Sequence, residues 1–276
     1  MPECLVNFDG MVWEPQRLRW HGLTFALDPE ADGAAELVLW KTPALVAQYQ
    51  AFWGREASFT ADRVLELGLW KGGSMAFWAE ALRPTRMVGV DLAPHSRSAA
   101  FDRYIAERKD RLSVHWGVDQ GNPGRLQALV AAAFTGPLDV VIDDASHRYE
   151  LTRRSFETLF PLLRPGGVYL IEDWAWYHWP AYQVPPSPFA GAIPLTRLAC
   201  ELVEAVGSAR SDGLVRCLGV RQGFLAIERG PAPATGPFSL DDVISRGPGR
   251  FPQSLRRLLG SPSGLYTLPL DGSERR

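Results

Sequence analysis

The chain has 276 residues, of which 46% are hydrophobic and 22% charged, so one large α/β domain with modest extensions is expected. Its formal net charge of −2 argues against nucleic-acid binding by bulk electrostatics, and its 3 scattered cysteines argue against a disulfide framework or a thiolate metal site. The N-terminus lacks a secretory-signal pattern and no apolar run approaches the roughly 18 residues of a membrane span, so we expect a soluble, cytoplasmic protein without a membrane partner.

The first part of the chain predicts an N-terminal extension over residues 1–55. Residues 5–27 alternate apolar and polar side chains around Asp9-Gly10, which predicts a strand or hairpin. Residues 28–36 are typical of a loop. Apolar residues then recur at helical spacing from about residue 37 to residue 53, which predicts a helix that precedes the main sheet.

A regular alternation of strands and helices begins at residue 63. Short apolar runs predict buried strands, and the segments between them predict helices. The expected strands are 63–68, 87–92, 112–119, 138–144 and 166–173, and the expected helices are 74–82, 98–109, 123–134, 149–163 and 196–207. Apolar strands that alternate with helices indicate a parallel sheet that is covered on both faces.

The last strands of the chain predict one edge of this sheet. Strands are expected at 214–221 and 223–230, and the Gln222-Gly223 step between them indicates an antiparallel edge pair. Over residues 56–230 we therefore expect an α/β fold: a Rossmann-like, doubly wound, mostly parallel seven-stranded sheet with helices on both faces. Residues 231–276 are rich in proline, glycine and serine and predict a C-terminal arm.

The glycine-rich turn after the first strand is a candidate cofactor site, because ligands of open α/β sheets bind outside the carboxyl ends of the strands. Gly68 and Gly72 allow a tight turn and a close approach of the backbone, and the helix that follows at Ser74 offers free N–H groups. Asp91 ends the second strand, where a carboxylate can accept hydrogen bonds from both hydroxyls of a ribose.

The third strand ends on Asp119 and Gln120, which are placed to recognise an adenine edge. The turn lacks the G-x-G-x-x-G spacing of dinucleotide-binding proteins, which counts against NAD. Glycine-rich turns also occur in α/β proteins that bind other nucleotides, so this stretch alone leaves the cofactor open between S-adenosylmethionine, NAD and another ligand. The predicted cofactor-binding residues are Glu66, Gly68, Gly72, Ser74, Asp91, Leu92, Asp119, Gln120 and Asp143.

Acidic residues gather at the ends of the fourth and fifth strands. Asp143 and Asp144 end the fourth strand, with His147 shortly after them, and Glu172 and Asp173 end the fifth. Adjacent parallel strands place these carboxylates close together, where they repel one another unless a cation binds. Oxygen ligands without cysteine favour a hard cation, Mg²⁺ or else Ca²⁺ or Mn²⁺, over zinc. His147 can accept a proton from a hydroxyl bound to the same metal.

Residues 140–174 resemble the metal-dependent class I methyltransferases of antibiotic and macrolide sugar biosynthesis, and are similar to the cephalosporin-hydroxylase-like proteins of the same fold. The similarity extends over residues 40–180. Glu66 matches the acidic residue of the E/D-x-G-x-x-x-G motif of class I methyltransferases, which implies a position near the methionine end of S-adenosylmethionine.

The resemblance also implies roles for the acidic residues. It implies Mg²⁺ bound by Asp144, Glu172 and Asp173, with His147 as the general base, and Ala145 replaces the usual glycine without changing this ligand set. The implied reaction transfers the methyl group of S-adenosylmethionine to a hydroxyl of a small-molecule acceptor, a sugar diol, a catechol or another vicinal pair of oxygens. The family precedent and the long terminal arms favour a homo-oligomer.

An aromatic and proline-rich segment, residues 174–195, follows the acidic residues directly. One interpretation is a surface loop whose rings pack on the domain. The other is a lid or wall for a sugar or polycyclic acceptor, because aromatic rings stack on such faces. The candidate substrate-binding residues are Trp174, Trp176, Tyr177 and Tyr182.

Three other functions compete with the small-molecule methyltransferase. An NAD-dependent oxidoreductase fits the fold class but not the glycine spacing. A non-catalytic partner protein would have no need of the acidic residues and histidine. A protein-directed methyltransferase is disfavoured, weakly, by the aromatic segment and the near-neutral charge.

Overall fold

The computed structural model describes residues 6–54, 59–92, 98–211, 213–234 and 236–244. Seven strands form one sheet of order β10-β11-β9-β8-β5-β6-β7. Five of them run parallel, namely β5 (Arg63–Leu67), β6 (Arg86–Asp91), β7 (Leu112–Trp116), β8 (Leu138–Asp143) and β9 (Leu163–Glu172). The last two, β10 (Val215–Val220) and β11 (Phe224–Arg229), form the expected hairpin, which joins β9 antiparallel. The predicted Rossmann-like, mostly parallel seven-stranded sheet is confirmed.

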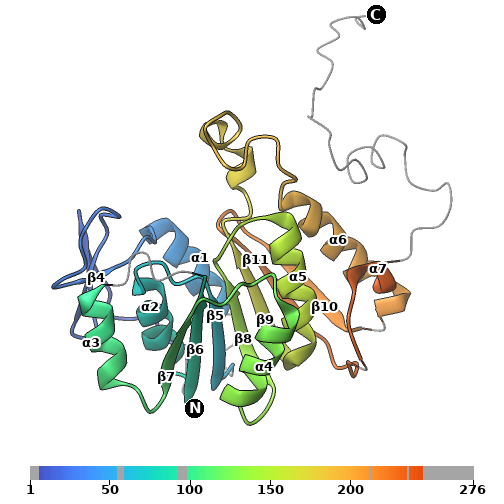
Figure 1. Ribbon diagram of the computed structural model, residues 1–276, viewed down its shortest axis with the longest axis horizontal. Helices are drawn as coiled ribbons and strands as arrows, with labels where there is room; N and C mark the ends of the chain where they lie inside the picture. Colours follow the sequence, from blue (N-terminus) through green and yellow to red (C-terminus); the bar gives the residue numbers. More distant parts are fainter. Residues whose placement is uncertain (1–5, 55–58, 93–97, 212, 235, 245–276) are drawn as a thin grey trace, which may run out of the picture.

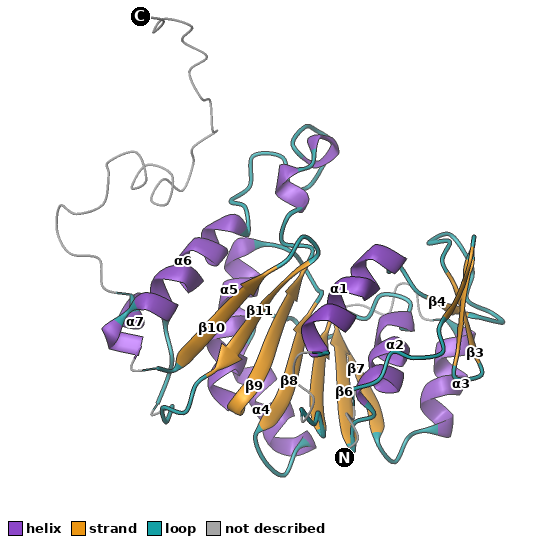
Figure 2. Ribbon diagram, turned by 180° about the vertical axis from the view of Figure 1, so that it is seen from behind, coloured by secondary structure: helices purple, strands orange, loops and turns teal. Residues whose placement is uncertain are grey.

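Helices cover both faces of the sheet (Figure 1, Figure 2). One face carries α1 (Pro43–Trp53), α2 (Gly73–Leu82) and α3 (Ala99–Glu107), and the other carries α4 (Pro123–Ala133), α5 (Tyr149–Leu159) and α6 (Thr196–Gly207). Successive strand residues alternate between the two cores: Val64 packs into the first and Leu65 into the second. Both faces are therefore buried, as the apolar strands predicted.

The order of the strands fixes where a ligand is expected. The chain builds β5, β6 and β7 in one direction and then returns to place β8 on the other side of β5. A crevice opens where the direction of building reverses, outside the carboxyl ends of β5 and β8. Gly68 and Asp144 follow these two strands directly, so both lie at this reversal point.

The N-terminal segment forms antiparallel strands, as predicted for residues 5–27, but their turns do not lie at Asp9-Gly10. It forms a separate sheet of β1 (Val12–Glu14), β2 (Arg17–Trp20), β3 (Leu23–Ala26) and β4 (Leu37–Val38). One hairpin turn lies at His21 and Gly22, whose φ angles of 49° and 77° suit a two-residue turn between twisted strands. Asp9-Gly10 instead precedes β1, where the Asp9 carbonyl accepts a 2.7 Å hydrogen bond from the Trp20 indole.

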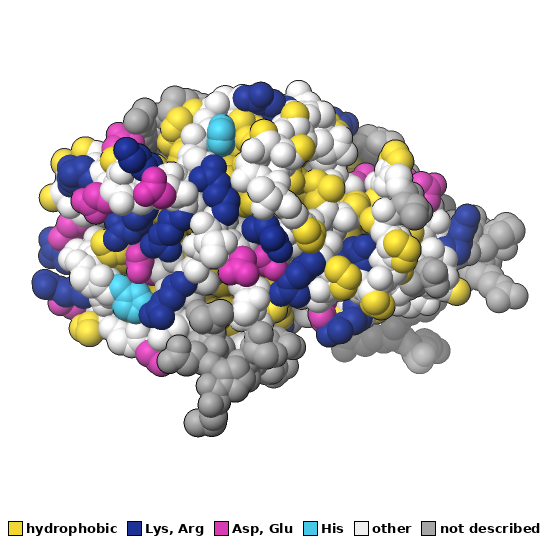
Figure 3. All heavy atoms as spheres, turned by 90° about the horizontal axis from the view of Figure 1, so that it is seen from below, with side chains coloured by type: hydrophobic (Ala, Val, Ile, Leu, Met, Phe, Trp, Pro, Cys, Tyr) yellow, Lys and Arg dark blue, Asp and Glu magenta, His cyan; other side chains and the backbone are white. Residues whose placement is uncertain are grey.

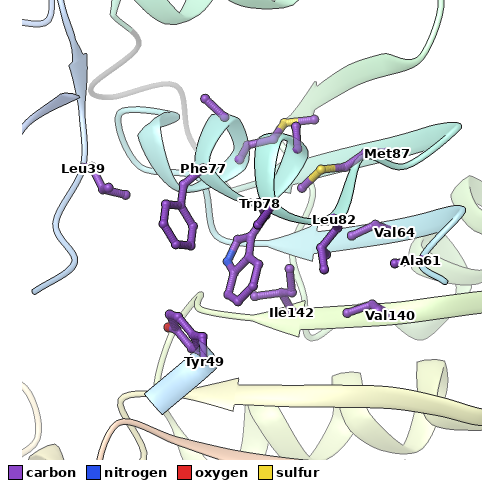
Figure 4. Packing of buried hydrophobic residues seen from close by; sticks show 14 of the residues in the cluster. Leu39, Tyr49, Ala61, Val64, Phe77, Trp78, Leu82, Met87, Val140 and Ile142 are labelled. Atoms are coloured by element: carbon purple, nitrogen blue, oxygen red, sulfur yellow. The ribbon is translucent and has the colours of Figure 1, made fainter. Parts of the chain in front are cut away.

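The predicted helix over residues 37–53 begins six residues later, at Pro43. The Thr42 hydroxyl accepts a 3.2 Å hydrogen bond from the Leu45 N–H and caps the helix, and proline suits its first turn. Residues 37–38 form β4 instead. Figure 4 shows Tyr49 of α1 directed toward Phe77 and Trp78 of α2, which holds this helix against the sheet.

The segment after β9 contains two short 3₁₀ turns, η2 (Trp176–His178) and η3 (Pro180–Tyr182), in place of regular structure. Near the end of the described chain a short helix that was not predicted, α7 (Leu240–Val243), docks on α5 through a 2.9 Å hydrogen bond from the Leu240 N–H to Glu157. The remainder of the predicted C-terminal arm, from residue 245, lies outside the described residues. The division into an extension, a domain and an arm stays a prediction.

Two further features concern the charged side chains of the surface and the length of the helices. Figure 3 shows basic and acidic side chains interspersed on the face seen from below. Every helix in the described ranges falls short of the length and apolar character needed to cross a membrane.

Candidate functional site

Two neighbouring cavities lie at the carboxyl ends of the parallel strands. The larger has a volume of about 500 Å³ and the smaller about 280 Å³, and both are lined by Gly68, Trp70, Asp144 and Ala145. Their shared wall therefore lies at the reversal point between β5 and β8, where the topology predicts a ligand.

The smaller cavity contains the residues predicted to hold a nucleoside. Asp91, Leu92, Asp119 and Gln120 all line it. The Asp91 carboxylate accepts hydrogen bonds of 2.8 and 3.0 Å from the Leu69 and Trp70 N–H groups, so the glycine-rich turn is fixed to the end of β6. The acidic and amide side chains at the ends of β6 and β7 are thus brought together, as predicted.

Gly68 allows the glycine-rich turn to lie against the loop after β8. Its φ of 87° is strained for any residue with a Cβ, and a Cβ there would lie 2.1 Å from the Asp144 carbonyl oxygen. Gly72, also predicted for cofactor binding, lies outside the cavity linings. It precedes α2 and packs against the Phe101 ring, so its role in this structure is packing.

Glu66 lies beneath the larger cavity and does not line it. It is fully buried, and Ser74, which does line the cavity, donates a 2.5 Å hydrogen bond to its Oε1. Burial raises the pKa of Glu66 to about 8. Its Oε2 makes no hydrogen bond to the described residues. Because the Glu66 carboxyl group is mostly protonated at neutral pH, it can donate a hydrogen bond to a nearby polar group, and it accepts one when ionised.

Asp143 was predicted to bind the cofactor, but the structure places it below the cavity floor. It is buried and accepts hydrogen bonds from the Ser155 hydroxyl at 2.6 Å, the Tyr169 hydroxyl at 2.8 Å and the Gln120 amide at 3.1 Å. The Gln120 oxygen in turn accepts a 2.9 Å hydrogen bond from the Ser146 N–H. Asp143 therefore orients Gln120 and the loop after β8 from behind.

The chemical centre of the larger cavity is formed by Asp144, His147 and Asp173. One ligand atom from each lies within 4.8 Å of the other two. His147 and Asp173 have φ angles of 53° and 55°, a conformation that costs free energy in residues with side chains and that is concentrated at functional sites. The two strained turns direct both side chains toward Asp144 across neighbouring strand ends.

Glu172, the third predicted metal ligand, does not join this group. Its Oε2 accepts a 2.5 Å hydrogen bond from the ammonium group of Lys41, which also lies 3.4 Å from Asp144. The Glu172 Oε1 is also buried, and the Tyr49 hydroxyl, which is buried beside it, is a hydrogen-bonding neighbour of the Glu172 carboxylate. Burial would lower the pKa of Lys41, but the charges of Glu172 and Asp144 outweigh it and raise this pKa above its ordinary value.

The donor set fits a divalent cation. Burial raises the pKa of Asp173 to about 8, together with repulsion from the charges of Asp144 and Glu172. A cation bound between these carboxylates would relieve that repulsion. Glu172 adds a further buried carboxylate beside Asp144, and burial, together with the charge of Asp144, raises the pKa of Glu172. Carboxylate oxygens without cysteine are ligands suited to Mg²⁺ or Mn²⁺, which leaves the His147 imidazole free to act as a base.

His147 lies beside the two aspartates in its neutral form, the form that can accept a proton. Burial lowers its pKa to about 4, so the imidazole is neutral at neutral pH and able to accept a proton. The backbone of Glu172 hydrogen-bonds the ring, and the Trp176 ring lies with its centroid 4.5 Å away. Both contacts fix the orientation of the imidazole beside the two aspartates.

Of the four aromatic residues predicted to contact substrate, Trp176 and Tyr182 line the larger cavity. Their rings are stacked, with centroids 5.1 Å apart and an interplanar angle of 7°. The structure places the other two elsewhere. The Trp174 indole donates a 2.8 Å hydrogen bond to the Arg221 carbonyl, and Tyr177 is buried against Phe189.

Other residues of the cavity lie outside the predicted site residues, among them Trp40, Lys41 and Trp70, while Trp179 belongs to the aromatic segment that was interpreted as a loop or a lid. Trp40 and Lys41 were assigned to a helix, and only the cap at Thr42 and Pro43 indicates that they precede it. The Trp40 ring contacts both Trp70 and Trp176, with centroids 5.9 and 6.4 Å apart. The extension thus completes an aromatic wall around the cavity mouth.

The chain is similar to methyltransferases of known function. Residues 65–174 match a family model described as a methyltransferase domain. Demethylmacrocin O-methyltransferase of Streptomyces fradiae is 31% identical over 245 residues, which cover 82% of this chain and 55% of that protein. Mycinamicin VI 2″-O-methyltransferase of Micromonospora griseorubida is 32% identical over 47% of this chain and 32% of its own length. The chain therefore spans about half the length, or less, of these relatives.

Solved structures give the same result. The mycinamycin-pathway methyltransferase MycE, solved in complex with Mg and S-adenosylhomocysteine (SAH), superposes with a TM-score of 0.51 at 28% identity. The superposition covers 67% of this chain and 49% of MycE. Residues 65–174 therefore match a methyltransferase domain, and the chain is similar to these O-methyltransferases over part of their length.

Proposed function

We propose that this chain is an S-adenosylmethionine-dependent O-methyltransferase that uses a divalent cation, Mg²⁺ by preference, to methylate a hydroxyl of a glycosylated small molecule. The observation that supports it most directly is the junction of two cavities at Asp144, with His147 and Asp173 converging on that residue. A nucleoside-sized cavity and an aromatic cavity share a wall that carries both a candidate cation site and a neutral histidine.

The residues present fit S-adenosylmethionine in the smaller cavity. Asp91 would accept hydrogen bonds from the ribose hydroxyls, while Asp119 and Gln120 would face the adenine. Gly68 lines both cavities, so the methionine part would pass over it toward Ser74. Glu66 would act through Ser74, because its side chain lies below the cavity surface.

Catalysis by this chain depends on holding and moving one proton. S-adenosylmethionine supplies an electrophilic methyl group, and a divalent cation beside an acceptor hydroxyl lowers the pKa of that hydroxyl. Asp144 and Asp173 would hold the cation, with Glu172 as the remaining predicted ligand. His147 would accept the hydroxyl proton, and Trp176 would exclude water from the imidazole.

The aromatic wall favours an acceptor with a sugar ring or an extended apolar ring system. The larger cavity is lined by five aromatic side chains: Trp40, Trp70, Trp176, Trp179 and Tyr182. The side chain of Trp40 is 60% exposed. Indole rings left open to water at a cavity gain free energy by stacking on an apolar ring face. The relatives named for macrocin and mycinamicin substrates favour the same class of acceptor.

Replacing Trp176 with alanine is expected to raise the KM for the acceptor about tenfold or more, because the indole stacks beside both the base and the acceptor cavity. Steady-state kinetics with saturating S-adenosylmethionine measures this. Trp13→Ala, in β1 and away from both cavities, is the control and should leave the KM unchanged. Equal KM values in the two variants would assign Trp176 to loop packing alone.

The experiment that tests the function is methyl transfer to a panel of glycosylated macrolide and polyketide acceptors, with Mg²⁺ or with EDTA, followed by mass spectrometry. One added methyl group on a sugar hydroxyl, lost in EDTA, is expected. The methyltransferase relatives favour this reaction over an NAD-dependent oxidation. A homo-oligomer, and the absence of a nucleic-acid or membrane partner, stay predictions.

A further inference from the structure

One residue of the carboxylate centre comes from the segment that precedes the match to the methyltransferase family model. Lys41 lies between β4 and α1, whereas the family match covers residues 65–174. Its side chain is buried, and its ammonium group lies 2.5 Å from Glu172 and 3.4 Å from Asp144. The N-terminal extension therefore places a permanent positive charge among the residues that would bind the metal.

The position of Lys41 is fixed on both sides. The Leu39 N–H donates a 2.9 Å hydrogen bond to the Ala26 carbonyl, and Thr42 caps α1. The ammonium group also lies 5.8 Å from the Tyr49 ring centroid and 6.0 Å from that of Trp78. Aromatic rings lie on one side of the ammonium group and carboxylates on the other, and only 2% of the side chain is exposed where Lys41 lines the larger cavity, so its charge stays in the centre.

The positive charge of Lys41 affects how strongly the carboxylates can bind a metal ion. If a bound cation keeps all three carboxyl groups ionised, Asp144, Glu172 and Asp173 carry three negative charges, and Lys41 neutralises one of them. The two that remain match one divalent cation. One oxygen of Glu172 and one of Asp144 already contact the ammonium group, so any cation that binds these carboxylates shares them with Lys41 and is repelled by it.

We propose that Lys41 is a resident cation of the carboxylate centre, which competes with the divalent metal for Glu172 and so weakens and sets the affinity of the site for metal. This inference rests on the proposed metal-dependent function. Lys41 acts here as a positioning residue: it holds Glu172 in place when no metal is bound, and it limits the centre to a single divalent cation.

The test is calorimetric titration of the full chain with Mg²⁺, comparing the wild type with Lys41→Met. Removing the charge is expected to tighten Mg²⁺ binding by at least about tenfold, since two unit charges a few ångströms apart interact strongly in a partly buried site. The double variant Lys41→Met/Glu172→Gln, which removes both members of the pair, should return close to wild-type affinity. Lys109→Met, an exposed lysine between α3 and β7, is the control and should not change it.

Thermal unfolding gives a second measurement that does not depend on turnover. Lys41→Met leaves Glu172 buried without its partner, so the variant should unfold at a lower temperature in EDTA and regain more stability from Mg²⁺ than the wild type does. Unchanged or weaker Mg²⁺ binding by a folded Lys41→Met variant, beside a wild type that binds Mg²⁺, would overturn this inference alone. If no variant bound Mg²⁺, the metal-dependent function would fail with it.

Discussion

Replacing His147 with alanine is expected to lower turnover by about 100- to 10,000-fold, the usual contribution of a general base. The imidazole is the neutral proton acceptor beside Asp144 and Asp173, and burial keeps its pKa near 4. The affinity for S-adenosylmethionine should stay within a fewfold of the wild-type value, because His147 does not line the smaller cavity. Single-turnover methyl transfer, together with calorimetry, separates the two effects.

His178→Ala is a matched control for this experiment. His178 lies in the aromatic segment after β9, and its ring hydrogen-bonds the Thr196 hydroxyl at 2.5 Å outside both cavity linings. It should retain turnover. If His147→Ala kept the wild-type rate, another group would have to accept the proton, and the assignment of the base would be wrong.

Replacing Gly68 with alanine is expected to destabilise the fold by about 2–4 kcal/mol and to weaken S-adenosylmethionine binding strongly. The left-handed φ costs about 1–2 kcal/mol in a residue with a Cβ, and forcing the loop after β8 to move costs a similar amount. The Cβ would lie 2.1 Å from the Asp144 carbonyl oxygen and 2.6 Å from the Ala145 Cα. The wall between the two cavities must therefore shift, and Asp144 moves with it.

Gly117→Ala separates the effect of the backbone angle from the effect of the collision. Gly117 has a φ of 73°, but nothing lies within 4 Å of the position of its Cβ. In this variant, chemical denaturation should show only the loss of stability caused by the left-handed φ angle. The affinity for the cofactor should be retained. Equal losses in both variants would show that the close approach of Gly68 to Asp144 does not form the site.

The sheet was predictable because its signal is local. Apolar runs such as residues 138–143 are buried on both faces, so their composition alone identifies a central strand of a parallel sheet. The parallel order then brings Asp144 and Asp173 together without further information, because adjacent parallel strands end at the same edge. The main features of the site therefore follow from the alternation of strands and helices.

The parts that sequence could not predict depend on contacts between distant segments. Asp143 and Asp144 look equivalent in the sequence, yet one is held below the floor by Tyr169 and Ser155 while the other lines both cavities. Lys41 reaches Glu172 across 131 positions of chain. No periodicity in the sequence encodes which lysine will meet which carboxylate, because that depends on how α1 packs against α2.

The most direct test of the central claim is a calorimetric titration of the purified chain with S-adenosylmethionine, first with Mg²⁺ and then with EDTA. The residues that would hold the nucleoside, Asp91, Asp119 and Gln120, lie in the smaller cavity away from His147 and Asp173. Micromolar binding in both conditions is therefore predicted, with methyl transfer confined to the first. An absence of binding in both conditions would contradict the assignment of this chain as an S-adenosylmethionine-dependent enzyme.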